Sequence, residues 1–199
     1  MRRAVFLDRD GVICQNRDDY VKSWEEFSFI PGALDAVARL AQSALDIVIV
    51  TNQSAINRGI VSSAIVEDIH ARMVHAIESA GGRVDLVMVC PHRPDEGCDC
   101  RKPRSGMLLA AAQELGVDLR QSYFIGDASS DVQAGQTVGC HSYLVLTGRG
   151  RDELMNCCTN GRGFRVATDL GMAADHILRK NTKSEMQPSF VVQGEEWRV

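Results

Sequence analysis

The sequence has no basic excess, because its 22 Lys and Arg are outnumbered by 26 Asp and Glu, which gives a formal charge of -4. General nucleic-acid binders and proteins of anionic membranes usually carry a basic excess or stripe, so we expect neither partner. Long apolar runs are also missing, since no segment approaches the roughly 18 apolar residues of a membrane span. The apolar run at 4–7 is far shorter than a signal-peptide core. These absences predict a cytoplasmic protein.

Proline is scarce, with 5 in 199 residues, whereas hydrophobic residues make up 45% of the chain and charged residues 24%. This is the composition of a packed domain, and it excludes disorder over most of the chain. A chain of this length can bury a full hydrophobic core. We therefore expect a folded protein.

Seven cysteines are present, and an odd number leaves at least one unpaired in any disulfide scheme. Three of them, Cys90, Cys98 and Cys100, lie close together with His92. In a reducing compartment such a cluster indicates metal binding before disulfide formation. The remaining cysteines are expected to be free thiols: Cys14, Cys140, Cys157 and Cys158.

Short apolar runs alternate with helical patterns along the chain. The runs predict strands at 4–7, 45–50, 84–90 and 123–126, with weaker ones at 141–146 and 164–167. The helical patterns lie at 31–44, 62–80, 106–115, 132–136 and 170–179. This alternation predicts βαβ units with right-handed crossovers, and so a doubly wound α/β fold with a parallel sheet. We expect one domain at 1–182 and a flexible tail at 183–199.

Polar residues follow four of these strands at the edge where doubly wound sheets place their working groups. The four segments are Asp8-Arg9-Asp10-Gly11, Thr51-Asn52-Gln53-Ser54, Arg101-Lys102 and Gly126-Asp127. The sheet would gather Asp8, Asp10 and Asp127 at one point, where they repel one another unless a cation lies among them. An all-oxygen site of this kind suits Mg²⁺. Any one of these acids alone could be a turn or cap residue, but all three beside Lys102 favour a functional site.

The clustered cysteines and histidine supply three thiolates and one imidazole, the donor set of a closed tetrahedral zinc site. These donors are Cys90, His92, Cys98 and Cys100. A zinc ion with no open position is structural. Because the loop ends directly before Arg101 and Lys102, zinc would hold these two cations at set positions.

Four segments in order resemble the four motifs of the haloacid dehalogenase superfamily of phosphatases. They are Phe6–Ile13, Thr51–Ser54, Arg101–Pro103 and Gly126–Asp127. Any one of them is a weak signal, but their order together with the zinc loop is specific. The resemblance covers residues 4–179.

The resemblance implies a role for each matching residue. Asp8 would be the nucleophile that forms an aspartyl-phosphate, and Asp10 would be the general acid and then the general base. Mg²⁺ would be held by Asp8, the backbone carbonyl of Asp10, and Asp127. Thr51 and Lys102 would hold the oxygens of the transferring phosphoryl group.

Within the superfamily, the segment from Cys90 to Pro103 is most similar to the zinc loop of the heptose bisphosphate phosphatases. This likeness implies a small phosphorylated sugar as substrate and hydrolysis of the 7-phosphate of a heptose bisphosphate. The residues at which it implies substrate contacts are Asp19, Tyr20, Asn52, Gln53, Ser54 and Arg101.

The sequence also departs from these relatives. Ala128 stands where they commonly have Lys, so one cationic substrate contact is missing. No long insertion follows Asp10 or separates the second and third motifs, which leaves no room for a separate cap domain and predicts an open site. Asp131 fits a first-turn acid of its helix slightly better than a role behind the metal ligands. The role of Cys14 stays open, and we expect a monomer.

Three other functions fit parts of the pattern. Histidinol-phosphate phosphatases have a similar zinc loop, and the sequence separates them only by degree of likeness. A nucleic-acid 3′-phosphatase is disfavoured by the acidic balance. A zinc-stabilised binding module without catalysis would retain the loop but have no need of Asp8.

Overall fold

The computed structural model describes residues 2–160 and 163–185 of the chain. Six strands form one sheet in the order β3-β2-β1-β4-β5-β6, and each neighbouring pair is parallel. The strands are β1 (Arg3–Leu7), β2 (Leu45–Asn52), β3 (Leu86–Cys90), β4 (Tyr123–Gly126), β5 (His141–Val145) and β6 (Arg165–Ala167). The predicted doubly wound α/β fold is confirmed.

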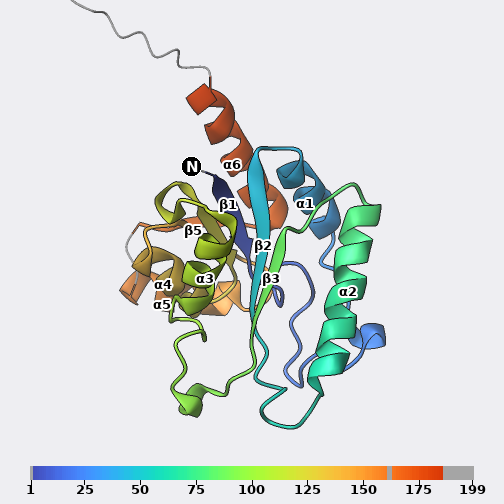
Figure 1. The fold of residues 1–199 in the computed structure, drawn as a ribbon. Helices are drawn as coiled ribbons and strands as arrows, with labels where there is room; N and C mark the ends of the chain where they lie inside the picture. The colour runs from blue at the N-terminus through green and yellow to red at the C-terminus, as the bar shows by residue number, and fades with distance from the viewer. Residues whose placement is uncertain (1, 161–162, 186–199) are drawn as a thin grey trace, which may run out of the picture.

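Helices cover both faces of the sheet (Figure 1). They are α1 (Ala33–Ala41), α2 (Ser63–Ser79), α3 (Gly106–Leu115), α4 (Ser129–Thr137), α5 (Gly150–Asn160) and α6 (Leu170–Glu185). Short 3-10 helices lie at Trp24–Glu26, Pro94–Glu96 and Leu119–Gln121. In the described part of the chain, no helix is long and apolar enough to cross a membrane.

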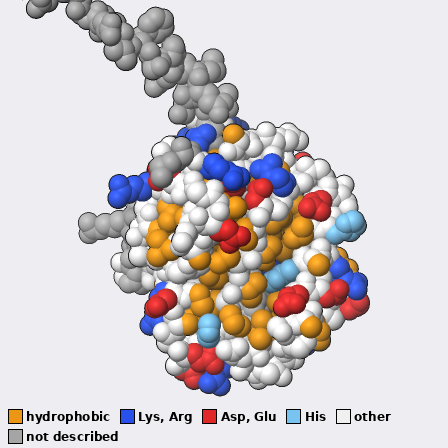
Figure 2. Space-filling model, viewed as in Figure 1, with side chains coloured by type: hydrophobic (Ala, Val, Ile, Leu, Met, Phe, Trp, Pro, Cys, Tyr) orange, Lys and Arg blue, Asp and Glu red, His pale blue; other side chains and the backbone are white. Residues whose placement is uncertain are grey.

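Alternate residues of each strand belong to different cores. In β1, Val5 and Leu7 pack with α1, α2 and α6, whereas Ala4 and Phe6 pack with α3 and α4. This is the period of two that a strand buried on both faces requires. The edge strand β3 is less buried, and Figure 2 shows hydrophobic side chains grouped over the middle of the face on which it lies.

Most predicted elements have the expected bounds within a few residues. Ser62 caps the start of α2, since the Ile65 amide donates to its Oγ at 3.3 Å. Two differences stand out: α5 was not predicted, and α6 continues to Glu185, beyond the predicted end at Arg179. Most of the proposed tail at 183–199 lies outside the described residues, and its first three residues are helical.

The strand order sets the position of the site. The chain moves outward from β1 through β2 to β3 and then crosses back to β4, which pairs with β1 on its other side. A doubly wound sheet binds its ligand beyond the carboxyl ends of the strands at such a switch point. In Figure 1 these ends point downward, toward the long loops that follow β1, β2 and β3.

Candidate active site

A cavity of about 460 Å³ opens at the carboxyl edge of the sheet. The segments that follow β1, β2, β3, β4 and β5 all contribute to its wall. Of the predicted site residues, it is lined by Asp8, Asp10, Tyr20, Asn52, Gln53, Ser54, Arg101 and Lys102. Thr51 and Asp127 are buried and do not line it. Asp19 is also outside the cavity wall, and its exposed carboxylate pairs instead with Arg17 and Lys22.

Lys102 links Asp8, the candidate nucleophile, to β2. Its Nζ lies 2.8 Å from Asp8 Oδ1 and 2.8 Å from Asp131 Oδ1, and it donates to the Val50 carbonyl at 2.9 Å. Burial by itself lowers the pKa of Lys102, but Asp131 and Asp8 outweigh it and raise the pKa above its ordinary value. The ammonium is therefore permanently charged at the floor of the cavity.

Asp8 is buried among like charges. Burial is the largest cause that raises its pKa to about 8, and Lys102 opposes this shift, while Asp131, Asp127 and Asp10 add to it. The backbone amide of Arg9 also donates to Asp8 Oδ1 at 2.7 Å. Without a cation besides Lys102, the carboxylate of Asp8 is thus difficult to keep ionised.

Three acids meet at the switch point between β1 and β4. Carboxylate oxygens of Asp8, Asp127 and Asp131 all lie within 4.8 Å of one another. Asp127 Oδ2 accepts the Arg149 amide at 2.8 Å, but its Oδ1 is buried and has no hydrogen-bond partner. An orphaned buried carboxylate oxygen beside two further acids is the donor set expected of a divalent cation site.

Asp131 has two partners rather than one. Its Oδ2 accepts the amide of Ala128 at 3.1 Å, which caps the start of α4 as a first-turn acid would. Its Oδ1 is the second partner of Lys102. The helix-capping interpretation is therefore incomplete, because the same carboxylate also holds the cation of the site.

Two glycines let the backbone pass close to Asp127. Gly11 has a left-handed φ of +84°, and a Cβ there would collide with the Asp127 carboxylate. A Cβ at Gly148, in the loop after β5, would collide with the same group. The absence of side chains at both positions is what allows Asp127 to sit beneath the loop that carries Asp8.

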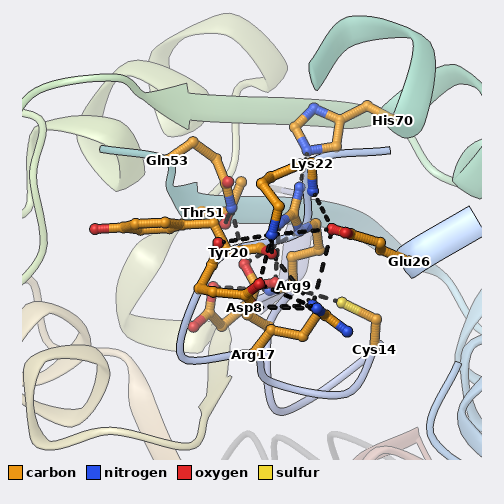
Figure 3. A network of polar contacts seen from close by, with 12 residues as sticks. Asp8, Arg9, Cys14, Arg17, Tyr20, Lys22, Glu26, Thr51, Gln53 and His70 are labelled. Carbon is orange, nitrogen blue, oxygen red and sulfur yellow. Dashed lines mark hydrogen bonds and ion pairs between the residues drawn. The ribbon is translucent and has the colours of Figure 1, made fainter. Parts of the chain in front are cut away.

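Asp10 is held by a network of donors from Arg9, Gln53 and Cys14, which Figure 3 labels. The Arg9 guanidinium donates from Nη2 to Oδ1 at 2.9 Å and from Nε to Oδ2 at 3.1 Å. Gln53 Nε2 donates to Oδ2 at 2.8 Å, and the Cys14 thiol to Oδ1 at 3.5 Å. Burial favours a raised pKa for Asp10, but the charge and hydrogen bonds of Arg9 outweigh it and lower the pKa.

Gln53 and Asn52, at the end of β2, hydrogen-bond to other residues of the site. Gln53 Nε2 also donates to Thr51 Oγ1 at 2.8 Å. Asn52 bonds the backbone of Lys102 twice, with Nδ2 donating to its carbonyl and Oδ1 accepting its amide, each at 3.2 Å. Asn52 therefore positions Lys102 in addition to lining the cavity.

The metal loop joins the cavity directly. The donor atoms of its cluster (Cys90, His92, Cys98 and Cys100) lie within 4.8 Å of one another. The Sγ atoms of Cys90 and Cys98 are 3.7 Å apart, those of Cys90 and Cys100 are 3.3 Å apart, and His92 Nδ1 lies 3.2 Å from Cys100 Sγ. Tetrahedral zinc with Zn–S bonds of about 2.3 Å has neighbouring sulfurs about 3.8 Å apart. The cluster is therefore already close to the size that zinc requires.

Several cavity residues carry charge that the sequence reasoning did not assign to the site. Arg17, Arg58 and Arg149 all line the wall. Arg149 follows β5, a strand with a weak sequence signal, so its position at a strand end was not apparent. Arg9 lies within the first motif, but its role depends on a contact with the distant His70.

Comparisons with known proteins agree with this geometry. The HAD-hydrolase-like family pattern matches residues 99–173. The chain is 45% identical over 178 residues to a D-glycero-β-D-manno-heptose-1,7-bisphosphate 7-phosphatase of Pseudomonas aeruginosa, with 89% of this chain and 99% of that protein covered.

Solved structures give the same result. A D,D-heptose 1,7-bisphosphate phosphatase of Bordetella bronchiseptica, complexed with magnesium and phosphate, superimposes with a TM-score of 0.84 at 42% identity, covering 89% of this chain and 99% of that one. The corresponding enzyme of Burkholderia thailandensis gives a TM-score of 0.69 at 34% identity over the same shares. The chain therefore belongs to the HAD-like hydrolases, in the family of the heptose 1,7-bisphosphate 7-phosphatases.

Proposed function

We propose that this protein is a Mg²⁺-dependent phosphomonoesterase that hydrolyses the 7-phosphate of D-glycero-β-D-manno-heptose 1,7-bisphosphate. The observation that carries the proposal is the buried pair of Asp8 and Lys102, 2.8 Å apart at the floor of a cavity whose wall also holds Asp10. Relatives that the chain covers almost completely are named as this enzyme. Phosphate esters hydrolyse very slowly in water, so both a placed nucleophile and charge neutralisation are needed.

In the first half-reaction, a carboxylate oxygen of Asp8 attacks phosphorus and forms an aspartyl-phosphate. The bond between phosphorus and the sugar oxygen breaks, and its electron pair stays on that oxygen. Arg9 keeps Asp10 as a carboxylate in the free protein, so Asp10 must take up a proton before this step. It then gives that proton to the oxygen as the sugar leaves. Lys102 and Thr51 stabilise the charge of the transferring group.

In the second half-reaction, water attacks the phosphorus of the aspartyl-phosphate. Asp10, now a carboxylate, takes a proton from this water. The bond between phosphorus and the Asp8 oxygen breaks, which releases inorganic phosphate and restores the Asp8 carboxylate. Asp10 regains in this step the proton that it gave in the first, so the cycle closes.

The acid cluster fits a divalent cation, because Asp127 Oδ1 is buried without a partner beside Asp8. Asp8, Asp127 and the Asp10 carbonyl would hold Mg²⁺, and the Bordetella relative is a magnesium and phosphate complex. When bound, the cation shields the nucleophile from the negative charge of the phosphate. The Cys/His cluster would hold a structural zinc ion that orders the loop carrying Arg101 and Lys102.

A bisphosphate brings a second anionic group, which cations at the mouth of the cavity would receive. Arg58 and Arg149 are exposed there, and Arg101 lies between the cavity and the zinc loop. Its Nη1 donates to the His92 carbonyl at 3.1 Å, which fixes it to that loop. Predicted substrate contacts also remain at Tyr20 and Ser54, whereas Asp19 would need to leave its ion pairs to take part.

We also propose one catalytic domain at 1–182 that acts as a monomer in the cytoplasm. None of the seven cysteines forms a disulfide, which supports a reducing compartment.

The test is phosphate release from the heptose bisphosphate and from histidinol phosphate, with Mg²⁺ present. We expect the heptose bisphosphate to be the better substrate and the Asp8→Asn variant to lose at least 1000-fold in kcat, because no nucleophile remains. Asp68→Asn, on the exposed face of α2, is the control and should keep full activity. Faster turnover of histidinol phosphate would contradict the heptose bisphosphate as substrate. An active Asp8→Asn variant would contradict Asp8 as the nucleophile.

A further inference from the structure

A fully buried arginine lies behind the active site. Arg9 stands between Asp8 and Asp10 in the sequence, yet its side chain is 1% exposed and among the largest fully buried groups of the protein. Burying a guanidinium is costly unless its donors find acceptors. Its acceptors are the Asp10 carboxylate and the ring of His70, which belongs to α2 (Figure 3).

The contact with His70 fixes the form of the imidazole. Arg9 Nη1 and His70 Nε2 are 3.0 Å apart. Because a guanidinium only donates hydrogen bonds, Nε2 must be the acceptor, so His70 is neutral with its proton on Nδ1. A second cation at this distance would repel Arg9. The helix thus contributes a neutral acceptor that holds the outer end of the guanidinium.

The other side of the guanidinium holds Asp10. The fork of Nε and Nη2 takes one carboxylate oxygen each, which fixes the plane of the carboxylate as well as its position. Gln53 and Cys14 add one donor to each oxygen. The Asp10 side chain keeps 21% exposure, and it lines the cavity. With two donors on each oxygen, the carboxylate is held in one orientation at the wall of the cavity.

We infer that Arg9 and His70 are positioning residues for the general acid, with α2 serving as the anchor of Asp10. This inference rests on the proposed function, since it assigns Asp10 the proton transfer of the first half-reaction. A carboxylate held only by its own rotamer could turn away from the leaving oxygen. Misplacement of a catalytic group by about 1 Å can cost about 100-fold in rate.

The inference makes a prediction about leaving groups. When the phosphorus–oxygen bond of a sugar phosphate breaks, the electron pair goes to an alkoxide that needs a proton from Asp10 at once. When p-nitrophenyl phosphate reacts, the pair goes to nitrophenolate, a stable anion that needs none. A fault in the placement of Asp10 should therefore slow the first substrate far more than the second.

The experiment compares kcat/KM for the heptose bisphosphate with kcat/KM for p-nitrophenyl phosphate, because this constant reports the steps up to release of the leaving group. Arg9→Met removes the fork. His70→Met removes the acceptor from α2, whereas His70→Gln keeps an acceptor at a similar reach. His75→Met, at an exposed position of the same helix, is the matched control.

We expect Arg9→Met and His70→Met to lower the ratio of the two constants by about 10- to 100-fold. His70→Gln should restore most of the ratio, and His75→Met should leave it at the wild-type value. If Arg9→Met does not fold, the comparison of His70→Met with His70→Gln tests the positioning role by itself. Equal losses on both substrates, or equal effects of His70→Met and His70→Gln, would show that these residues serve only folding.

Failure of the proposed function has a different signature. Wild-type protein would then not release phosphate from the heptose bisphosphate, whatever the variants do. The ratio is then measured with histidinol phosphate, because its leaving group, histidinol, also departs as an alkoxide. An unchanged ratio in an active wild-type background overturns the positioning role alone.

Discussion

The buried His70 ring couples the stability of the protein to pH. Burial is the largest cause, and the Arg9 charge the next, that lower its pKa to about 4 from an ordinary 6.5, while Asp10 opposes the shift. Between these two values the unfolded chain binds more protons at this residue than the folded protein does. The contribution is therefore fully present above pH 6.5 and decreases as the pH falls toward 4.

We predict that His70→Gln flattens the acid side of the stability profile. A shift of this size corresponds to about 3 kcal/mol over the whole window. Urea unfolding at pH 7, 6 and 5 should show a smaller loss of unfolding free energy for the variant than for the wild type. His75→Gln should keep the wild-type slope, and the same slope in His70→Gln would contradict the neutral, buried assignment.

At the scale of single residues, the sequence predicts what is local and misses what is distant. Asp8 and Asp10 follow a buried strand directly, so their placement could be predicted. The role of His70 could not be predicted, because its contact with Arg9 spans 61 positions and depends on how α2 is turned. The ion pairs of the exposed Asp19 carboxylate with nearby Arg17 and Lys22 were also not predicted.

Among the elements, strands and amphipathic helices were predictable and α5 was not. The α5 sequence is mostly polar and has a weak apolar face, in which Cys157 is buried while Met155 is 73% exposed. Its place is set by packing of Cys157 on Leu144 and Val132 rather than by a periodic pattern. Because α5 was missed, the cavity residues Arg149 and Glu153 at its start were missed as well.

The zinc loop is the element whose integrity the active site depends on most directly. It runs from the end of β3 to Lys102, and it is bonded to the cavity through Arg101 and the His92 carbonyl. We predict that Cys98→Ser loses zinc, lowers the melting temperature and reduces kcat, because Lys102 would no longer be held against Asp8. Metal analysis, thermal melts and phosphate release on the same samples measure the three effects.

Cys158→Ser is the control for this experiment, since Cys158 is an exposed thiol of α5. It should keep zinc, stability and activity. Full activity and an unchanged melting temperature after verified loss of zinc would contradict a structural role. Recovery of EDTA-treated enzyme with zinc alone, and not with Mg²⁺, would reverse the assignment of the two metals.

For the whole molecule, the sequence predicts the class of sheet but not its order. Alternation of strands and helices is enough to expect parallel pairing. The meeting of Asp127 with Asp8 was predicted, and the pairing of β4 with β1 produces it, but the addition of Asp131 follows from the packing of the complete chain. The first and fourth motifs, which lie far apart in the sequence, meet for this reason alone.

Because Asp8, Asp127 and Asp131 meet here, we expect the stability of the whole fold to depend on a cation. Burial first, and then Asp131, raise the pKa of Asp127 to about 6, so the folded protein without metal resists its ionisation. A cation that binds only the folded state, at a concentration 100 times its Kd, stabilises the fold by about 2.7 kcal/mol, which is about 5–10 °C in melting temperature at this chain length.

We predict that Mg²⁺ raises the melting temperature of the wild type by an amount of this order. Asp127→Asn should melt higher than the wild type in EDTA, because one buried charge is gone, and should gain little from Mg²⁺. Asp68→Asn should behave as the wild type in both conditions, and an undiminished gain from Mg²⁺ in Asp127→Asn would move the cation away from the β1–β4 switch point.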